Sequence, residues 1–313
     1  MKRHVANRLQ ALRGAALLLL LAVWQQAMAA EPLVAADWAA ANAGKPGIVF
    51  IDFSGPADFL RGHIPGAVNS NYGKDGWREE RADKVPDMLP ANLDKLAGMI
   101  GRLGIDNGTH VVLAPPGMSS SDMGMGTRVY WTFKVLGHDN VSILDGGMAG
   151  YFAQAREKKY PLATGAAKAE PKSFKANVRR DMIVTMEDVK KARAAGVVLV
   201  DNRPEDYYAG ITRHPKASAA GTIEGARNLP NAWLTVNGGG NFRNKAQLAQ
   251  LYKHAGVPVS AEEINFCNSG HWASVGWFVS SELMGNKKAR MYDGSMIEWT
   301  MKGNPVEQKV RLQ

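Results

Sequence analysis

The sequence contains one pattern twice, and this internal repeat limits the folds that the chain can adopt. A short apolar run that ends in aspartate occurs at residues 47–52 and again at 197–201. Each run is followed by the same Gly-Ala-x-Asn sequence, at residues 66–69 and 225–228. Short apolar runs that alternate with helix-like stretches are typical of parallel α/β units. Two copies of such a unit predict two domains of similar fold.

The later part of each copy supports the same division. A second strand is predicted at residues 110–113 and at 264–266, and a helix-like stretch follows each of them. We therefore expect an α/β protein of two tandem domains, each a parallel sheet flanked by helices. The predicted domains are residues 33–156 and 181–313. Residues 157–180, rich in Lys, Ala and Pro and without apolar periodicity, are predicted to be a linker.

Residues 1–30 are predicted to be a signal peptide and not part of the fold. Four cations precede an apolar run at residues 15–23, and Ala27-Met28-Ala29 supplies the small residues that a signal peptidase recognises. An uncleaved membrane anchor is the alternative, but the apolar run is shorter than the ~20 residues of a membrane span. We therefore expect a periplasmic or secreted protein that keeps no stable membrane anchor after cleavage.

Part of the positive charge of the chain lies in the predicted leader. The formal net charge of +9 falls to +5 without the four cations Lys2, Arg3, Arg8 and Arg13 of the leader. A modest positive charge favours small anions as ligands. A nucleic-acid partner is not expected, because the sequence lacks the clustered basic residues of such proteins.

The chain has one cysteine, Cys267. A lone thiol in an oxidising compartment cannot form an internal disulfide, so it is either an inert buried residue or a reactive group. Cys267 directly follows a predicted strand and precedes a helical stretch at residues 274–284. The loop N–H groups and the positive end of that helix would stabilise a thiolate or the outer sulfur of a persulfide. Gly270 would let the loop turn tightly. This context favours the reactive thiol.

Two motifs around this loop resemble the active-site half of the rhodanese-family sulfurtransferases. They are Cys-x-x-Gly-x-x-Ala at residues 267–273 and Tyr-Asp-Gly-Ser-x-x-Glu-Trp at 292–299. The resemblance covers nearly the whole chain after the leader. It implies tandem rhodanese-like domains, of which the C-terminal one is catalytic and the N-terminal one is not. The first half has Ala114 at the position expected to match Cys267.

The resemblance also implies a cation that binds the donor, just after the strand aspartate. Here that residue is Arg203, for which a structural ion pair with Glu205 or Asp206 is the alternative. Arg213 is a second candidate.

The loop after Cys267 is expected to form the rest of the substrate site, and its residues are Asn268, Ser269, Gly270, His271, Trp272 and Ala273. Members of the family that use thiosulfate typically carry basic residues directly after the cysteine, whereas Ser269-Gly270 is closer to those that use mercaptopyruvate. His271 is expected to donate a hydrogen bond to the persulfide or to carry a proton near neutral pH, or else to face solvent. Trp272 is expected to line the pocket or to pack in the core. Residues 118–123 of the first half either cover the cleft of the other domain or form a surface loop.

The expected reaction is a two-step sulfur transfer through Cys267. A small anionic donor such as thiosulfate would leave its outer sulfur on the thiolate, and a thiophilic acceptor (cyanide, a thiol or a protein cysteine) would remove it. No metal or organic cofactor is expected, since no zinc-ligand spacing is present. A 3-mercaptopyruvate sulfurtransferase and a sulfur carrier or binding module without turnover are the alternatives. A Cys-x5-Arg phosphatase or arsenate reductase is disfavoured, because residue 273 is alanine.

The leader makes one prediction of its own. Exported protein should begin near Ala30 or Glu31, because cleavage is expected directly after the small residues at 27–29. Intact-mass analysis of the exported protein measures this start. Recovery of chains that retain Met1 in the membrane fraction would contradict the assignment.

Overall fold

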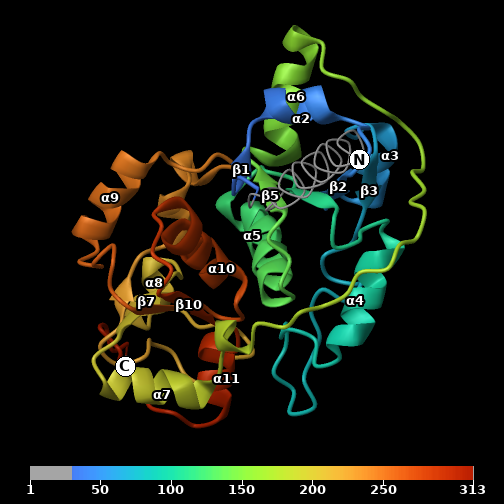
Figure 1. Ribbon diagram of the computed structural model, residues 1–313. Helices are drawn as coiled ribbons and strands as arrows, with labels where there is room; N and C mark the ends of the chain where they lie inside the picture. Colours follow the sequence, from blue (N-terminus) through green and yellow to red (C-terminus); the bar gives the residue numbers. More distant parts are fainter. Residues whose placement is uncertain (1–29, 313) are drawn as a thin grey trace, which may run out of the picture.

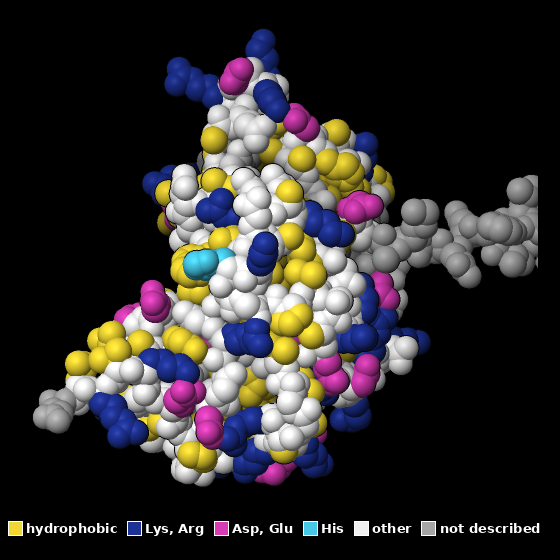
Figure 2. Space-filling model, turned by 90° about the vertical axis from the view of Figure 1, so that its left-hand side faces the viewer, with side chains coloured by type: hydrophobic (Ala, Val, Ile, Leu, Met, Phe, Trp, Pro, Cys, Tyr) yellow, Lys and Arg dark blue, Asp and Glu magenta, His cyan; other side chains and the backbone are white. Residues whose placement is uncertain are grey.

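A computed structural model describes residues 30–312 of the chain (Figure 1). The predicted signal peptide lies outside these residues, apart from Ala30. Within the described part, no helix has the length and apolar character needed to cross a bilayer. On the face drawn in Figure 2, Lys and Arg side chains are interspersed with Asp and Glu.

Each half of the chain forms a five-stranded sheet in which every pairing is parallel. The strand order is β1-β5-β4-β2-β3 in the first sheet and β6-β10-β9-β7-β8 in the second. The strands of the first are β1 (Leu33–Val34), β2 (Ile48–Asp52), β3 (Ala67–Asn69), β4 (His110–Ala114) and β5 (Val141–Leu144). Those of the second are β6 (Ile183–Val184), β7 (Val198–Asp201), β8 (Arg227–Asn228), β9 (Glu263–Phe266) and β10 (Ala289–Tyr292). The predicted α/β class with two tandem domains is confirmed.

Helices flank both sheets, as buried parallel strands require. The first domain has α2 (Ala36–Asn42), α3 (Pro56–Arg61), α4 (Leu93–Arg102), α5 (Ser120–Val135) and α6 (Gly147–Lys158). The second has α7 (Met186–Ala194), α8 (Glu205–Ala209), α9 (Lys245–His254), α10 (His271–Phe278) and α11 (Ser295–Met301). A short π-helical turn, Val279–Leu283, continues α10.

The repeated Gly-Ala-x-Asn sequence has the same structural role in both domains. Gly66 and Gly225 both have a φ of 80°, a left-handed conformation that glycine adopts without steric cost. The asparagine three residues later donates two hydrogen bonds of 2.9 Å across the end of the neighbouring strand. Asn69 bonds the carbonyls of Asp52 and Ser54, and Asn228 bonds those of Asp201 and Arg203. The repeat therefore fixes the loop that follows β2 and β7.

The predicted linker packs against the first domain. It runs as an extended segment along the first domain before it enters the second (Figure 1). Its amides at Lys172 and Asn177 donate to the carbonyls of Gly101 and Leu136, each over 2.8 Å. Phe174 is buried in the core between them.

The two domains meet where α5 packs beside α10 (Figure 1). Small residues allow the close approach, since a side chain at Gly124 would collide with the ring of His271. Further along, the hydroxyls of Thr127 and Ser274 are 2.7 Å apart, and the rings of Tyr130 and Phe278 meet edge to face. One continuous apolar core extends through both domains.

A buried ion pair crosses this interface. Arg128 of α5 lies 2.6 Å from Asp293, which follows β10, and both side chains are almost fully buried. Asp293 also accepts the amide of Leu89 of the first domain over 2.6 Å. The matching aspartate of the first domain, Asp145, accepts the amide of Phe242 of the second over 2.9 Å. The aspartates that the sequence repeats thus bind each domain to a loop of the other.

Replacing Arg128 by methionine is predicted to lower the free energy of unfolding by about 3–5 kcal/mol, because it leaves Asp293 buried without its cation. Urea unfolding measures this change. The double variant Arg128→Met/Asp293→Asn should recover part of the loss. Arg61→Met, which removes an exposed pair with Asp58 on the same domain, is the matched control and should have little effect. An Arg128→Met variant as stable as this control would show that the pair does not hold the interface.

Candidate active site

Cys267 lies directly after β9, at the carboxyl end of the second sheet, and its side chain is only 1% exposed. The carboxyl ends of parallel strands are where α/β folds form their ligand sites. The thiol borders a pocket of about 310 Å³ that both domains line. The lining residues are Tyr72, Arg78, Ser121 and Met125 of the first domain and His214, Cys267, Asn268, Ser269, His271 and Trp272 of the second.

Ser295 holds the loop that carries Cys267. Its Oγ accepts the amides of Cys267 and Gly270 over 3.0 and 3.2 Å and donates to the carbonyl of Tyr292. The carbonyls of Cys267 and Asn268 in turn accept the amides of Met296 and Ile297, each over 3.0 Å. The Tyr-Asp-Gly-Ser motif therefore fixes both ends of the loop through one buried hydroxyl.

Five other amides of the loop and of the first turn of α10 have no hydrogen-bond partner in residues 30–312, namely those of Asn268, Ser269, His271, Trp272 and Ala273. Free amides at the start of a helix favour an anion. Gly270, with a φ of 75°, makes the turn possible, since a side chain there would collide with Arg128 and Asp293. The loop can therefore receive an anionic sulfur next to Cys267.

His271 joins the domains instead of facing solvent. Its Nε2 lies 2.8 Å from the carbonyl of Ser121, and its Nδ1 lies 3.0 Å from the hydroxyl of Tyr72. A carbonyl only accepts, so Nε2 carries the proton and the Tyr72 hydroxyl donates to Nδ1. Burial, together with the charge of Arg78, lowers the pKa of His271 to about 4. The expectation of a proton carrier near neutral pH is therefore wrong, because the ring is neutral there and both nitrogens are occupied.

Trp272 forms a wall of the pocket, as one of the two expectations stated. Its Nε1 donates to the hydroxyl of Ser121 over 3.1 Å, and its ring meets that of Tyr207 edge to face. Since both His271 and Trp272 bond Ser121, residues 118–123 cover part of the cleft of the other domain. Ala273 is buried in the first turn of α10.

The structure does not bring Arg203 to this pocket. Arg203 is 2% exposed, and its guanidinium folds back onto Asp201, with Nη2–Oδ2 and Nε–Oδ1 distances of 2.6 and 2.9 Å. Nη2 also donates to the carbonyl of Gly221. The ion pair is therefore structural, but with Asp201 and not with Glu205 or Asp206. Arg213 bonds the carbonyl of Ala217 and does not line the pocket either.

Strand pairing corrects the expected match between the two halves. Asp52 pairs with Ala114, whereas Asp201 pairs with Phe266, so the residue that matches Cys267 is Pro115 and not Ala114. The amide of Met148 bonds the carbonyl of Pro115, as that of Met296 bonds the carbonyl of Cys267. By the same register Gly147 matches Ser295, and both have a positive φ. The first domain thus lacks both the thiol and the hydroxyl that holds its loop.

Sequence reasoning missed Tyr72 and Arg78. They stand in the segment between β3 and α4, which contains no strand, so no periodicity indicated that it reaches the other domain. A tyrosine and an arginine in an irregular segment of the first half carry no local signal for a site that is centred on Cys267.

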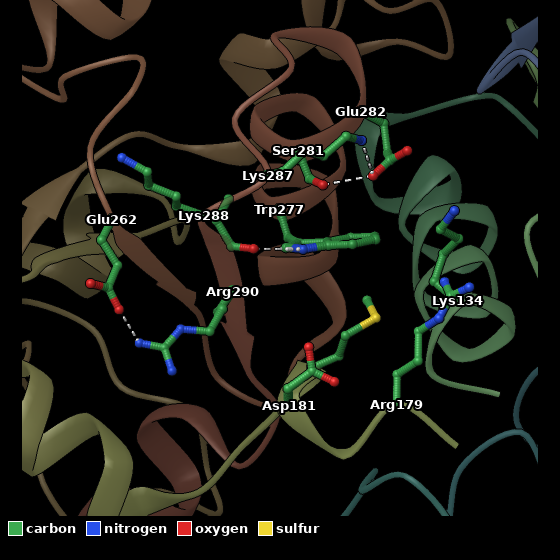
Figure 3. Close-up of a pocket in the computed structure, with 12 residues that line it drawn as sticks. Lys134, Arg179, Asp181, Glu262, Trp277, Ser281, Glu282, Lys287, Lys288 and Arg290 are labelled. Atoms are coloured by element: carbon green, nitrogen blue, oxygen red, sulfur yellow. Dashed lines mark hydrogen bonds and ion pairs between the residues drawn. The ribbon is translucent and has the colours of Figure 1, made fainter. Parts of the chain in front are cut away.

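A second pocket, of about 470 Å³, lies elsewhere between the domains (Figure 3). Of its charged side chains, Lys287 pairs with Glu282 and Arg290 with Glu262, and Lys134 and Arg179 both pair with Asp139. Its lining includes no thiol. Within residues 30–312, no three His, Cys, Asp or Glu side chains form a group that could hold a metal ion. The pocket at Cys267 is therefore the candidate active site.

Comparison with known proteins finds similarity to one family over both domains. The chain matches the family described as "Rhodanese-like domain" at residues 35–154 and 185–302. A Mycobacterium tuberculosis protein named "Putative thiosulfate sulfurtransferase" is 31% identical, over 88% of this chain and 98% of that protein. "Sulfur carrier protein TtuD" of Thermus thermophilus is 29% identical, over 86% and 93%. The crystal structure of SseA from Escherichia coli, described with the 3-mercaptopyruvate sulfotransferases, superposes with a TM-score of 0.71 at 25% identity, covering 85% of this chain and 99% of SseA.

The lowered pKa of His271 predicts a specific loss of stability in acid. Its pKa is about 4 in the folded protein and about 6.5 in the unfolded chain. Between these values only the unfolded chain binds the proton, so stability is complete above pH 6.5 and falls as the pH falls towards 4. Wild type should lose about 2–3 kcal/mol more than His271→Asn between pH 7 and pH 4.5. Urea unfolding at both pH values measures the difference. An equal loss in both proteins would show that His271 is not held neutral.

Proposed function

Since this chain belongs to the rhodanese family of sulfurtransferases, we propose that it transfers sulfur through a persulfide on Cys267. The observation that carries the proposal is the placement of the one thiol of the chain beside a row of free loop amides. Such amides stabilise an anion on either sulfur of a persulfide without the help of a metal.

In the first step the Cys267 thiolate attacks the outer sulfur of the donor. With thiosulfate, a bond forms between Sγ and that sulfur, the sulfur–sulfur bond of the donor breaks, and sulfite leaves with the electron pair. The amides of Asn268, Ser269 and His271 would stabilise the anionic terminal sulfur that remains. Ser295 has no direct contact with the donor in this scheme. Its Oγ accepts the amides of Cys267 and Gly270 and so keeps the loop amides in position.

In the second step an acceptor removes the outer sulfur. Cyanide, a thiol or a protein cysteine attacks it, the sulfur–sulfur bond of the persulfide breaks, and Cys267 is again a thiolate. No proton needs to be taken up near Sγ, which is consistent with a neutral His271 whose two nitrogens are engaged. The cycle requires no organic cofactor.

We propose thiosulfate as the first donor to test, on the support of the mycobacterial relative's name. One feature favours 3-mercaptopyruvate instead, because Asn268 and Ser269 provide no cation after the cysteine. The likeness to SseA supports the same alternative. A sulfur carrier would use the same persulfide without turnover, and repeated turnover with a soluble acceptor separates it from an enzyme. We further propose that the mature protein acts in the periplasm or outside the cell, on the support of the leader at residues 1–30.

Cys267→Ser should abolish sulfur transfer, with activity below about a hundredth of wild type, because removal of a covalent nucleophile typically costs far more than this. Steady-state transfer from thiosulfate and from mercaptopyruvate to cyanide measures the activity. The urea-unfolding midpoint of the variant should stay near that of wild type, since serine is close to cysteine in size. Activity that survives in a folded Cys267→Ser protein would exclude the persulfide.

A further inference from the structure

The pocket at Cys267 is completed by a domain that has no nucleophile. Four of its lining residues, Tyr72, Arg78, Ser121 and Met125, come from the first domain. Ser121 and Tyr72 are fixed by their bonds to His271 and Trp272. Arg78 is different, because none of its contacts joins it to the catalytic loop. Its presence in the wall of the pocket is not explained by the domain interface.

Arg78 is held in place while most of its hydrogen-bonding capacity stays free. Its guanidinium lies 4.1 Å above the ring of Tyr72, and one nitrogen, Nη1, lies 3.0 Å from Asp87. The Nε atom is buried and has no hydrogen-bond partner in the part of the chain that the structure describes. A guanidinium has five N–H donors, and a buried donor without a partner is costly. Stacking on Tyr72 orients the group in advance for an anion that offers it two oxygens.

Within residues 30–312, Arg78 is also the one Lys or Arg side chain that lines this pocket. The other basic groups there are His271, with its lowered pKa, and His214, whose pKa burial lowers. Arg128 lies under the loop, but its charge is paired with Asp293, and the charge of Arg203 is paired with Asp201. Sulfur donors such as thiosulfate and mercaptopyruvate are anions, so a pocket for them needs a cation that they can reach. Arg78 is paired with Asp87, but that pair is partly exposed, whereas the pairs of Arg128 and Arg203 are buried.

We propose that Arg78 binds the anionic group of the sulfur donor, so that the domain without a nucleophile selects the donor. This inference rests on the function proposed above. The reacting sulfur is held at the loop amides, and the sulfonate or carboxylate of the donor is held by Arg78 against Tyr72. Asp87 competes for the same guanidinium and so weakens donor binding. Its side chain is 39% exposed, which allows water to solvate it when the donor takes its place.

Substitutions of Arg78 and of Asp87 should change donor binding in opposite directions. Arg78→Met should lower kcat/KM for thiosulfate about ten- to a hundredfold, mainly through a higher KM, since the contact is already made before the reaction. Arg78→Lys should recover only part, because an ammonium group cannot fork onto two oxygens. Asp87→Asn should lower KM, since it removes the competing carboxylate. Asparagine also tolerates the left-handed conformation of residue 87, where φ is 62°.

The experiment measures the two half-reactions separately. Formation of the Cys267 persulfide is followed by mass spectrometry against thiosulfate concentration, and its discharge is followed after the donor has been removed and cyanide added. In Arg78→Met, formation should require more thiosulfate, and discharge of persulfide loaded at saturating donor should stay within about twofold of wild type. Arg213→Met, which removes a cation of the second domain that does not line the pocket, is the matched control and should leave both half-reactions unchanged.

Results that contradict the role of Arg78 differ from the result that contradicts the proposed function. Unchanged persulfide formation in Arg78→Met, or equal losses in formation and discharge, would overturn the role of Arg78. The same is true if Arg213→Met loses donor binding and Arg78→Met does not. If Arg78→Met does not fold, a KM in Asp87→Asn that is equal to or above that of wild type overturns it. Absence of persulfide in wild type with every donor would instead contradict the proposed function itself.

Discussion

The contact between α5 and α10 is the constraint on which the site depends. Gly124, Thr127 and Ser274 let the two helices approach, and the Arg128–Asp293 pair joins α5 to the loop after β10, next to Gly270. The amino end of α10 carries the loop of Cys267, so the same contact brings Ser121 and the segment of Tyr72 and Arg78 over the thiol. The domain without a nucleophile thus supplies four of the ten residues that line the pocket of the other.

The two domains differ in the two positions that matter most for the chemistry. Their loops share a backbone bond, since the carbonyls of Pro115 and Cys267 accept the amides of Met148 and Met296. In each domain this methionine follows a residue with a positive φ. Only the second loop has a thiol and a serine hydroxyl, that of Ser295, to bind its amides. In the first, proline and glycine take these places. The internal comparison separates what folds the loop, which both domains share, from what makes it reactive.

Much of this arrangement was predictable from the sequence, and the rest was not for physical reasons. The strands and the repeat were found because buried parallel strands are short apolar runs, and Cys267 was found because its loop is contiguous in sequence. The predicted match of Ala114 to Cys267 was wrong by one residue. The register of β4 against β2, and of β9 against β7, depends on pairing between strands that are distant in sequence. The expectation that Arg203 binds the donor was wrong, because its guanidinium folds back onto Asp201, two residues earlier in the chain. The place of Arg78 in the pocket and the neutral state of His271 depend on how the two domains pack, which no local sequence pattern indicates.

The central claim is that sulfur passes through Cys267 as a discrete intermediate. The most direct test loads the protein with thiosulfate labelled in its outer sulfur, removes the donor completely, and then adds unlabelled cyanide. The account predicts one label per chain, located on Cys267, and its quantitative recovery as thiocyanate in a single turnover. Label that reaches thiocyanate only while donor and acceptor are present together, with none retained on the protein, would contradict it.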